Sequence, residues 1–163
     1  MHETNDGYFK NKIGTYILII SVTEPSLVHV GQLGEFQLQP GTYLYVGSAL
    51  GTGSTSLKHR LARHILKSKP LKWHIDYITT LPHARVQYVI VVETSHQLEC
   101  LLSMHIARLD GVGCPLKRFG SSDCSNCESH FYSYPKNIEQ AVKACNNIML
   151  KLGFRSKIIS IET

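Results

Sequence analysis

The feature that most constrains the fold is a strand, a glycine-rich turn and a basic helix that follow one another over residues 45–64. The strand ends in YVGSA, the glycines of the turn let the backbone reverse sharply, and the helix begins near residue 57. This order places the phenol of Tyr45, the guanidinium of Arg60 and the imidazole of His64 around one glycine-lined corner. We expect such a corner to suit a phosphodiester.

The spacing of the helix supports this interpretation. Leu57, Leu61 and Ile65 recur at i, i+4 and i+8 and form an apolar stripe, while Arg60 and His64 share the neighbouring stripe. Arginine offers a planar charged fork for phosphate oxygens, and a histidine can accept or relay a proton near neutral pH. The alternative is an ordinary solvated basic helix.

Length and charge limit the function classes. A chain of 163 residues is expected to form one domain with a real core, over residues 13–155, between a loose segment (1–12) and a C-terminal tail (156–163). The net charge of +5 suits a polyanionic partner such as nucleic acid, with DNA expected ahead of RNA. The longest apolar run, residues 16–22, is far too short to span a membrane, so no membrane association is expected.

Five cysteines, an odd number, occur without a secretory signal pattern. This usage is typical of a reducing compartment, where we expect the cysteines to remain thiols. The expected location is therefore the cytoplasm.

Apolar patterning predicts an α/β (α+β) fold, in which helices flank a small antiparallel or mixed sheet of three or more strands. A hydroxyl cluster is expected to cap the first helix, and Leu101 is among the residues of the second helix expected to face inward. The segment 73–78 (WHIDYI) is ambiguous. The expected strands are 14–22, 42–47 and 84–92, with a short hairpin over 28–38, and the expected helices are 54–67, 95–110 and 138–150.

Two tripeptides and two single residues stand in a characteristic order along the chain: Gly14-Thr15-Tyr16, Tyr45-Val46-Gly47, Arg60 and Glu99. In these motifs and their order the chain resembles the GIY-YIG nuclease superfamily. Within it, the chain is most similar to an uncharacterised stand-alone family of GIY-YIG-like proteins, and the resemblance covers roughly residues 13–134. The motifs of that narrower family stand here as Gly47-Ser48-Ala49, Arg63-His64, Trp73 to Tyr77, Glu99-Cys100 and Phe119 to Cys124. The excursion over 23–40 implies an extra hairpin between the two tyrosine motifs.

The resemblance implies a hydrolase that cuts nucleic-acid phosphodiester bonds with one Mg²⁺ or Mn²⁺ ion. Tyr16 would activate the attacking water, Tyr45 would assist by hydrogen bonding, and Arg60 would stabilise the phosphorane, while Glu99 would hold the metal. His64 matches a histidine that some members carry four residues after the arginine. Because a phenol titrates near pH 10, Tyr16 needs a neighbour that makes its phenolate accessible.

Further residues are expected to bind the substrate. His74 and Asp76 belong to the narrower family's motif, although a two-residue spacing in a strand would also place them simply on one face. Trp73 is expected in the core rather than stacked on a base. The expected substrate-binding set is Gly47, Ser48, Lys58, Arg63, His74 and Asp76.

A second group, Cys124, Cys127 and His130, has zinc-ligand types, and Cys114 offers a possible fourth ligand. The spacing to the histidine is tight and no second ligand pair follows at finger distance. We therefore favour a structured loop, capped by Asp123 and serines, over a Zn²⁺ site.

Two functions are compatible with these observations. A metal-dependent endonuclease is favoured. A nucleic-acid-binding module that keeps the fold without efficient cleavage is the alternative.

Overall fold

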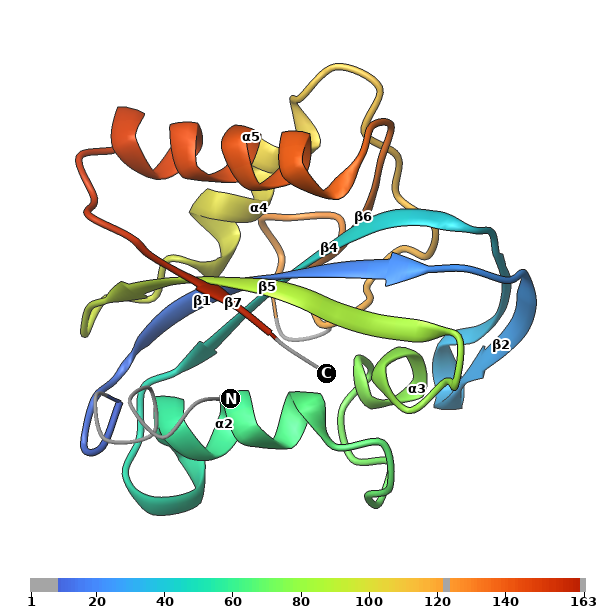
Figure 1. Cartoon of the computed structure of the whole chain (residues 1–163), viewed down its shortest axis with the longest axis horizontal. Helices are drawn as coiled ribbons and strands as arrows, with labels where there is room; N and C mark the ends of the chain where they lie inside the picture. The colour runs from blue at the N-terminus through green and yellow to red at the C-terminus, as the bar shows by residue number, and fades with distance from the viewer. Residues whose placement is uncertain (1–8, 122–123, 162–163) are drawn as a thin grey trace.

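The computed structural model describes residues 9–121 and 124–161, and its fold is α+β as expected from the sequence. A five-stranded antiparallel sheet with the order β6-β4-β1-β5-β7 crosses the middle of the molecule (Figure 1). Its strands are β1 (Gly14–Val22), β4 (Gly41–Ala49), β5 (Ala84–Glu93), β6 (Phe131–Tyr134) and β7 (Lys157–Ser160).

The predicted hairpin between the two tyrosine motifs is confirmed. It consists of β2 (Ser26–Val30) and β3 (Gly34–Leu38), joined by the short helix η1 (Gly31–Leu33), and forms a separate two-stranded sheet. Val28, Val30, Phe36 and Leu38 turn inward from it and join the core beside the main sheet.

Helices cover both faces of the main sheet. In Figure 1, α4 (Glu99–Ala107) and α5 (Ile138–Lys151) lie above it, and α2 (Leu57–Ile65) and α3 (Asp76–Thr79) lie below it. Because both faces are covered, β1 reads as an almost continuous apolar run: Ile17 and Ile19 pack toward α4 and α5, and Tyr16 and Leu18 pack toward the opposite side. The central strand is therefore anchored on both sides.

Two local expectations are wrong, and one segment left open by the sequence is settled. Ser56 occupies the N-cap position of α2, but its hydroxyl makes no capping bond and donates instead to the carbonyl of Gly53 in η2 (Gly53–Thr55). Leu101 is 39% exposed, because it lies outside the stripe of Leu98, Leu102, Ile106 and Leu109 that packs into the core. The ambiguous segment 73–78 ends in the helix α3 rather than in a strand.

Both end regions of the described chain pack into the fold more than the sequence suggested, one in the sheet and one in the core. The sequence assigned 156–163 to a tail, yet β7 pairs with β5 from Lys157 to Ser160. At the other end, Phe9 is buried within the segment expected to be loose, of which residues 1–8 lie outside the described part of the chain.

Among the described residues, the helices are all too short or too polar to traverse a bilayer.

Candidate active site

A pocket of about 320 Å³ opens at the edge of β4, just past the point where its pairing with β6 ends at Tyr45. Tyr16, Tyr45, Arg60, His64 and Glu99 all line it, although more than eighty positions separate the first from the last. The structure therefore brings the five side chains to which the resemblance gave catalytic roles onto one concave surface. The remaining lining residues are Gly47, Ser48, Lys72, Trp73, His74 and Gly120.

Tyr16 and His64 form the innermost contact of the pocket. Tyr16 Oη lies 2.6 Å from His64 Nε2, and both side chains are only 1% exposed. Gly47 faces Tyr16 across the β1–β4 ladder, and a Cβ at this position would lie 2.8 Å from the phenol oxygen. A glycine is therefore required opposite Tyr16. This explains why the motif Tyr45-Val46-Gly47 ends in glycine.

Burial fixes the protonation of this pair. It lowers the pKa of His64 to about 3; nearby Lys69, Arg60 and Arg63 act in the same direction, and Asp76 opposes them. The imidazole is therefore neutral, and Nε2 accepts the phenolic hydrogen of Tyr16. Burial also raises the pKa of Tyr16 well above its usual value, helped by Tyr45 and opposed by Arg60. In the resting protein Tyr16 is a phenol.

Tyr45 lies on the same face of the sheet as Tyr16. It pairs with Leu18, two residues along β1 from Tyr16, so the alternation of the strand puts both phenols on one side. Burial raises the pKa of Tyr45 and Glu99 adds to the shift, while Arg60 opposes it. Tyr45 is therefore also a neutral hydrogen-bonding group at rest.

Arg60 connects the helix to the strand edge. Its Nη1 donates to the carbonyl of Ser48 at 2.9 Å, and its guanidinium lies 4.6 Å from the centre of the Trp73 ring. Arg63 lies at 4.7 Å from the same ring, so Trp73 contacts two guanidinium groups. These contacts hold the charge of Arg60 at the pocket.

Glu99 is the first residue of α4 and reaches round the sheet edge into the pocket. Ser48 Oγ donates to its Oε1, and its Oε2 lies 3.5 Å from His130 Nδ1. Burial raises the pKa of Glu99 and Arg60 opposes the shift. Among the described residues that line the pocket, Glu99 carries the only carboxylate.

The expected substrate-binding residues divide into two groups. Gly47, Ser48 and His74 line the pocket, whereas Lys58, Arg63 and Asp76 do not. His74 uses its Nδ1 to accept a bond of 2.8 Å from the backbone N–H of Gly120, so it also holds the 119–130 segment.

Asp76 is a buried structural group. Its Oδ2 accepts hydrogen bonds from the backbone N–H groups of Lys72 and Trp73 and from the Arg63 side chain, at 2.8–2.9 Å. Burial alone would raise its pKa, but these donors and nearby Lys69 hold the pKa below its usual value. The expectation that Asp76 meets the substrate is wrong, because its carboxylate is enclosed in the turn that begins α3.

Three lining residues were not predicted as site residues. Trp73 is half-buried at the pocket rather than a full core residue, because two arginines cover its faces. Lys72 precedes it in the sequence, and Gly120 closes the far wall with a φ of 71°. The glycine within the Phe119–Cys124 motif was the available signal for Gly120.

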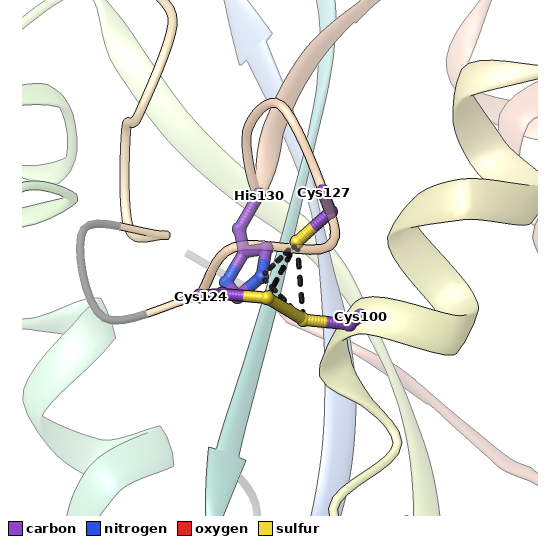
Figure 2. A group of neighbouring side chains, drawn as sticks. All are labelled: Cys100, Cys124, Cys127 and His130. Carbon is purple, nitrogen blue, oxygen red and sulfur yellow. Dashed lines mark hydrogen bonds between the residues drawn. A yellow bond between two sulfur atoms is a disulfide. The ribbon is translucent and has the colours of Figure 1, made fainter.

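A second cluster lies behind Glu99. Cys100, Cys124, Cys127 and His130 bring one ligand atom each to within 4.8 Å of one another, so this group could hold a metal ion (Figure 2). The fourth member is Cys100 and not Cys114, which is a correction to the ligand set considered from sequence. Cys100 and Cys124 are joined as a disulfide, against the expectation that all five cysteines remain thiols. Asp123, expected to cap this loop, lies outside the described residues.

Comparison with known proteins gives one match. The family model "Domain of unknown function DUF123" matches residues 15–153, which is most of the chain, so the protein belongs to this family. No curated protein and no solved structure matches the chain.

Proposed function

We propose that this member of the DUF123 family is a metal-dependent endonuclease that hydrolyses nucleic-acid phosphodiester bonds by GIY-YIG-type chemistry. The observation that carries the proposal is the pocket itself, in which Tyr16, Tyr45, Arg60, His64 and Glu99 meet. Two phenols, a guanidinium, a neutral imidazole and one carboxylate are the groups that such a hydrolysis needs.

In the proposed reaction, Tyr16 and His64 move the proton of the attacking water. Tyr16 Oη accepts a proton from water while its own proton passes across the 2.6 Å contact to His64 Nε2. The water oxygen then bonds to phosphorus as the bond to the leaving oxygen breaks; the leaving oxygen keeps the bonding electron pair and takes a proton from solvent. A phosphate anion in the pocket favours this transfer, because negative charge nearby raises the proton affinity of the imidazole.

Arg60 offsets the charge that develops on the phosphate during attack. Its guanidinium remains charged at any relevant pH and presents several donors in one plane. The contacts to the Ser48 carbonyl and to Trp73 hold it in position before the substrate arrives. This preorganisation is the usual source of electrostatic stabilisation in an active site. Tyr45, neutral and beside Arg60, would donate a hydrogen bond to the same phosphate.

The donor set at Glu99 fits a single Mg²⁺ or Mn²⁺ ion. These cations keep several water ligands and take further oxygen ligands from substrate phosphate, so one carboxylate is sufficient. Glu99 would hold the ion, which when bound would polarise a phosphoryl oxygen. The bonds from Ser48 and toward His130 orient the carboxylate and leave lone pairs on its oxygens.

A nucleic-acid-binding module is the second candidate. One observation favours it: burial raises the pKa of both pocket phenols, so neither is a ready base in the free protein. Such a module would use Arg60, Lys72 and the exposed part of Trp73 to bind the backbone and a base.

The two candidates are separated by a cleavage assay on plasmid, single-stranded DNA, branched DNA and RNA, with Mg²⁺, Mn²⁺ or EDTA. The endonuclease cuts at least one of these only with metal, and Arg60→Ala abolishes cleavage and weakens binding. Arg108→Ala, which removes an exposed arginine beyond α4, serves as the control and leaves both unchanged. Salt-sensitive binding without any cleavage would favour the binding module.

A further inference from the structure

The cluster formed by Cys100, Cys124, Cys127 and His130 is built from two distant parts of the chain. Cys100 lies in the first turn of α4, and the other three lie in the loop that leads into β6 (Figure 2). Cys127 Sγ is at the centre of the group. It lies 3.1 Å from Cys100 Sγ, 3.3 Å from Cys124 Sγ and 3.0 Å from His130 Nε2.

These separations are close to those of ligands on one small metal ion. Zinc bonds of about 2.3 Å to sulfur and about 2.0 Å to nitrogen place neighbouring tetrahedral ligands about 3.5–3.8 Å apart. Cys100 Sγ and His130 Nε2 are already 3.8 Å apart. The four donors face one another, as Figure 2 shows.

A disulfide between Cys100 and Cys124 uses only two of the four donors. It leaves the Cys127 thiol in contact with both sulfur atoms of the disulfide, and the His130 imidazole in contact with Cys127 Sγ and Cys100 Sγ. The Cα atoms of Cys100 and Cys124 are 7.5 Å apart, beyond the range of about 4.4–6.8 Å that disulfides usually span. A central metal ion accounts for all four residues and for the wider backbone separation.

We propose that the reduced protein binds one structural Zn²⁺ ion through Cys100, Cys124, Cys127 and His130. The three thiols lose their protons, and three sulfur–zinc bonds and one nitrogen–zinc bond form without any change of oxidation state. Three thiolates and a neutral imidazole complete a tetrahedral shell, so no position is left open for substrate. The ion ties residues 124–130 to the first turn of α4.

The other ring nitrogen of His130 connects this site to the pocket. His130 is buried, and its Nδ1 has no hydrogen-bond partner within the described residues other than the nearby Glu99 carboxylate, whose Oε2 is 3.5 Å away. With Nε2 on the metal, the remaining proton must reside on Nδ1, which then points a donor at Glu99. A carboxylate that supports a zinc-bound histidine in this way is a common arrangement around zinc.

The loop that contains His130 is also hydrogen-bonded to other parts of the pocket wall. Its Gly120 N–H donates to His74, and the backbone N–H of Val46 in β4 donates to the carbonyl of His130 at 2.9 Å. A separate cavity of about 550 Å³, lined in part by Cys100, Cys124 and His130, gives the ion a path from solvent. The zinc site therefore positions Glu99 and Gly120 without contacting the substrate.

Metal content tests the proposal independently of any nuclease activity. The wild-type chain, purified with a thiol reductant, without chelator, and passed through gel filtration, should carry one zinc per chain by elemental mass spectrometry. Cys100→Ser should reduce this to less than one tenth. Cys114→Ser, a matched change at a free cysteine outside the cluster, should keep the full content. Zinc-free wild type with a Cys100–Cys124 disulfide, or equal zinc loss in the two variants, would overturn the proposal.

Cobalt substitution of the wild type keeps the test decisive if Cys100→Ser does not fold. Co²⁺ added to the zinc-depleted, reduced chain should give intense visible bands and a sulfur-to-metal charge-transfer band, the signature of a tetrahedral thiolate site. One equivalent of Zn²⁺ should abolish both. A weak octahedral spectrum that Zn²⁺ leaves unchanged would contradict the site.

Discussion

At the scale of single residues, the pocket depends on a glycine that makes room for a tyrosine. Tyr16 reaches His64 because its ring lies over the position where any other residue at 47 would place a Cβ. The contact between a neutral imidazole and a phenol is in turn the route by which Tyr16 would pass on its proton. Gly47 therefore shapes the pocket by making room for the Tyr16 ring.

Gly47→Ala tests this dependence. A methyl group 2.8 Å from the Tyr16 ring forces the ring to move, so we expect a loss of about 1–3 kcal/mol in the free energy of unfolding. In a Tyr16→Leu background the same substitution should cost clearly less, with a coupling energy of at least roughly 1 kcal/mol. Denaturant unfolding of the four proteins measures the cycle. Additive effects of the two changes would show that the ring does not restrict position 47.

At the scale of elements, the turn before α3 is organised by one buried carboxylate. Asp76 accepts from two backbone N–H groups and from Arg63, and its side chain is fully buried. Arg63 in turn covers one face of Trp73, whose other neighbour is Arg60. The position of Trp73 at the pocket thus rests on Asp76.

We expect Asp76→Asn to destabilise the protein by about 3 kcal/mol, because it removes the charge that pairs with the half-buried Arg63 and keeps only the shape. Thermal unfolding measures the loss. Asp110→Asn, at an exposed position after α4, is the control and should change stability little. Equal effects of the two substitutions would mean that the Asp76 interactions contribute no net stability.

The long elements are predictable from the sequence and the short ones are not. β1, β4, β5 and α5 carry an apolar run or a helical period over nine or more residues, so their own pattern identifies them. β6, β7 and α3 have four residues each and form because a neighbouring strand or the Asp76 carboxylate satisfies their backbone groups. The sequence pattern of such a short segment carries no information about these distant partners, so it does not predict the element.

The pocket residues were also easier to predict from the sequence than the cysteine and histidine cluster. The order of the tyrosine, arginine and glutamate motifs, together with the histidine four residues after the arginine, indicated the five side chains that line the pocket. Cys100 was missed as a companion of Cys127 and His130, because their proximity is created only when α4 packs beside the loop before β6. The sequence predicts a core position for Trp73, but the ring lies at the pocket against Arg60 and Arg63. Both arginines belong to α2, so these contacts arise only when α2 packs beside residue 73.

At the scale of the whole molecule, the buried His64 makes stability depend on pH. In the unfolded chain His64 has its ordinary pKa of 6.5. In the folded protein, burial lowers the pKa of His64 to about 3. The nearby cations Lys69, Arg60 and Arg63 act in the same direction, and the Asp76 carboxylate opposes them. Between these values the unfolded state binds more protons, so the free energy of unfolding falls as the pH decreases from 6.5 toward 3.

We expect His64 alone to lower the free energy of unfolding by roughly 2 kcal/mol at pH 5 relative to pH 8. His64→Gln, which can still accept from Tyr16, should remove that part of the pH dependence. His59→Gln, at an exposed position on the same helix, is the control and should retain it. Urea unfolding at a series of pH values measures the difference. Parallel pH profiles for His64→Gln and wild type would contradict a buried neutral histidine.

The central claim is that the pocket performs metal-dependent hydrolysis of a phosphodiester, and Glu99→Gln tests it most directly. The substitution keeps the size of the side chain and removes the charge that would hold the metal. The measurement is the single-turnover cleavage rate in Mg²⁺, paired with nucleic-acid affinity in EDTA, for wild type, Glu99→Gln and Glu139→Gln, an exposed control on α5. We predict that Glu99→Gln lowers the rate by on the order of 100-fold or more and leaves affinity nearly unchanged, while Glu139→Gln changes neither. Cleavage by Glu99→Gln at a rate near wild type would contradict the account.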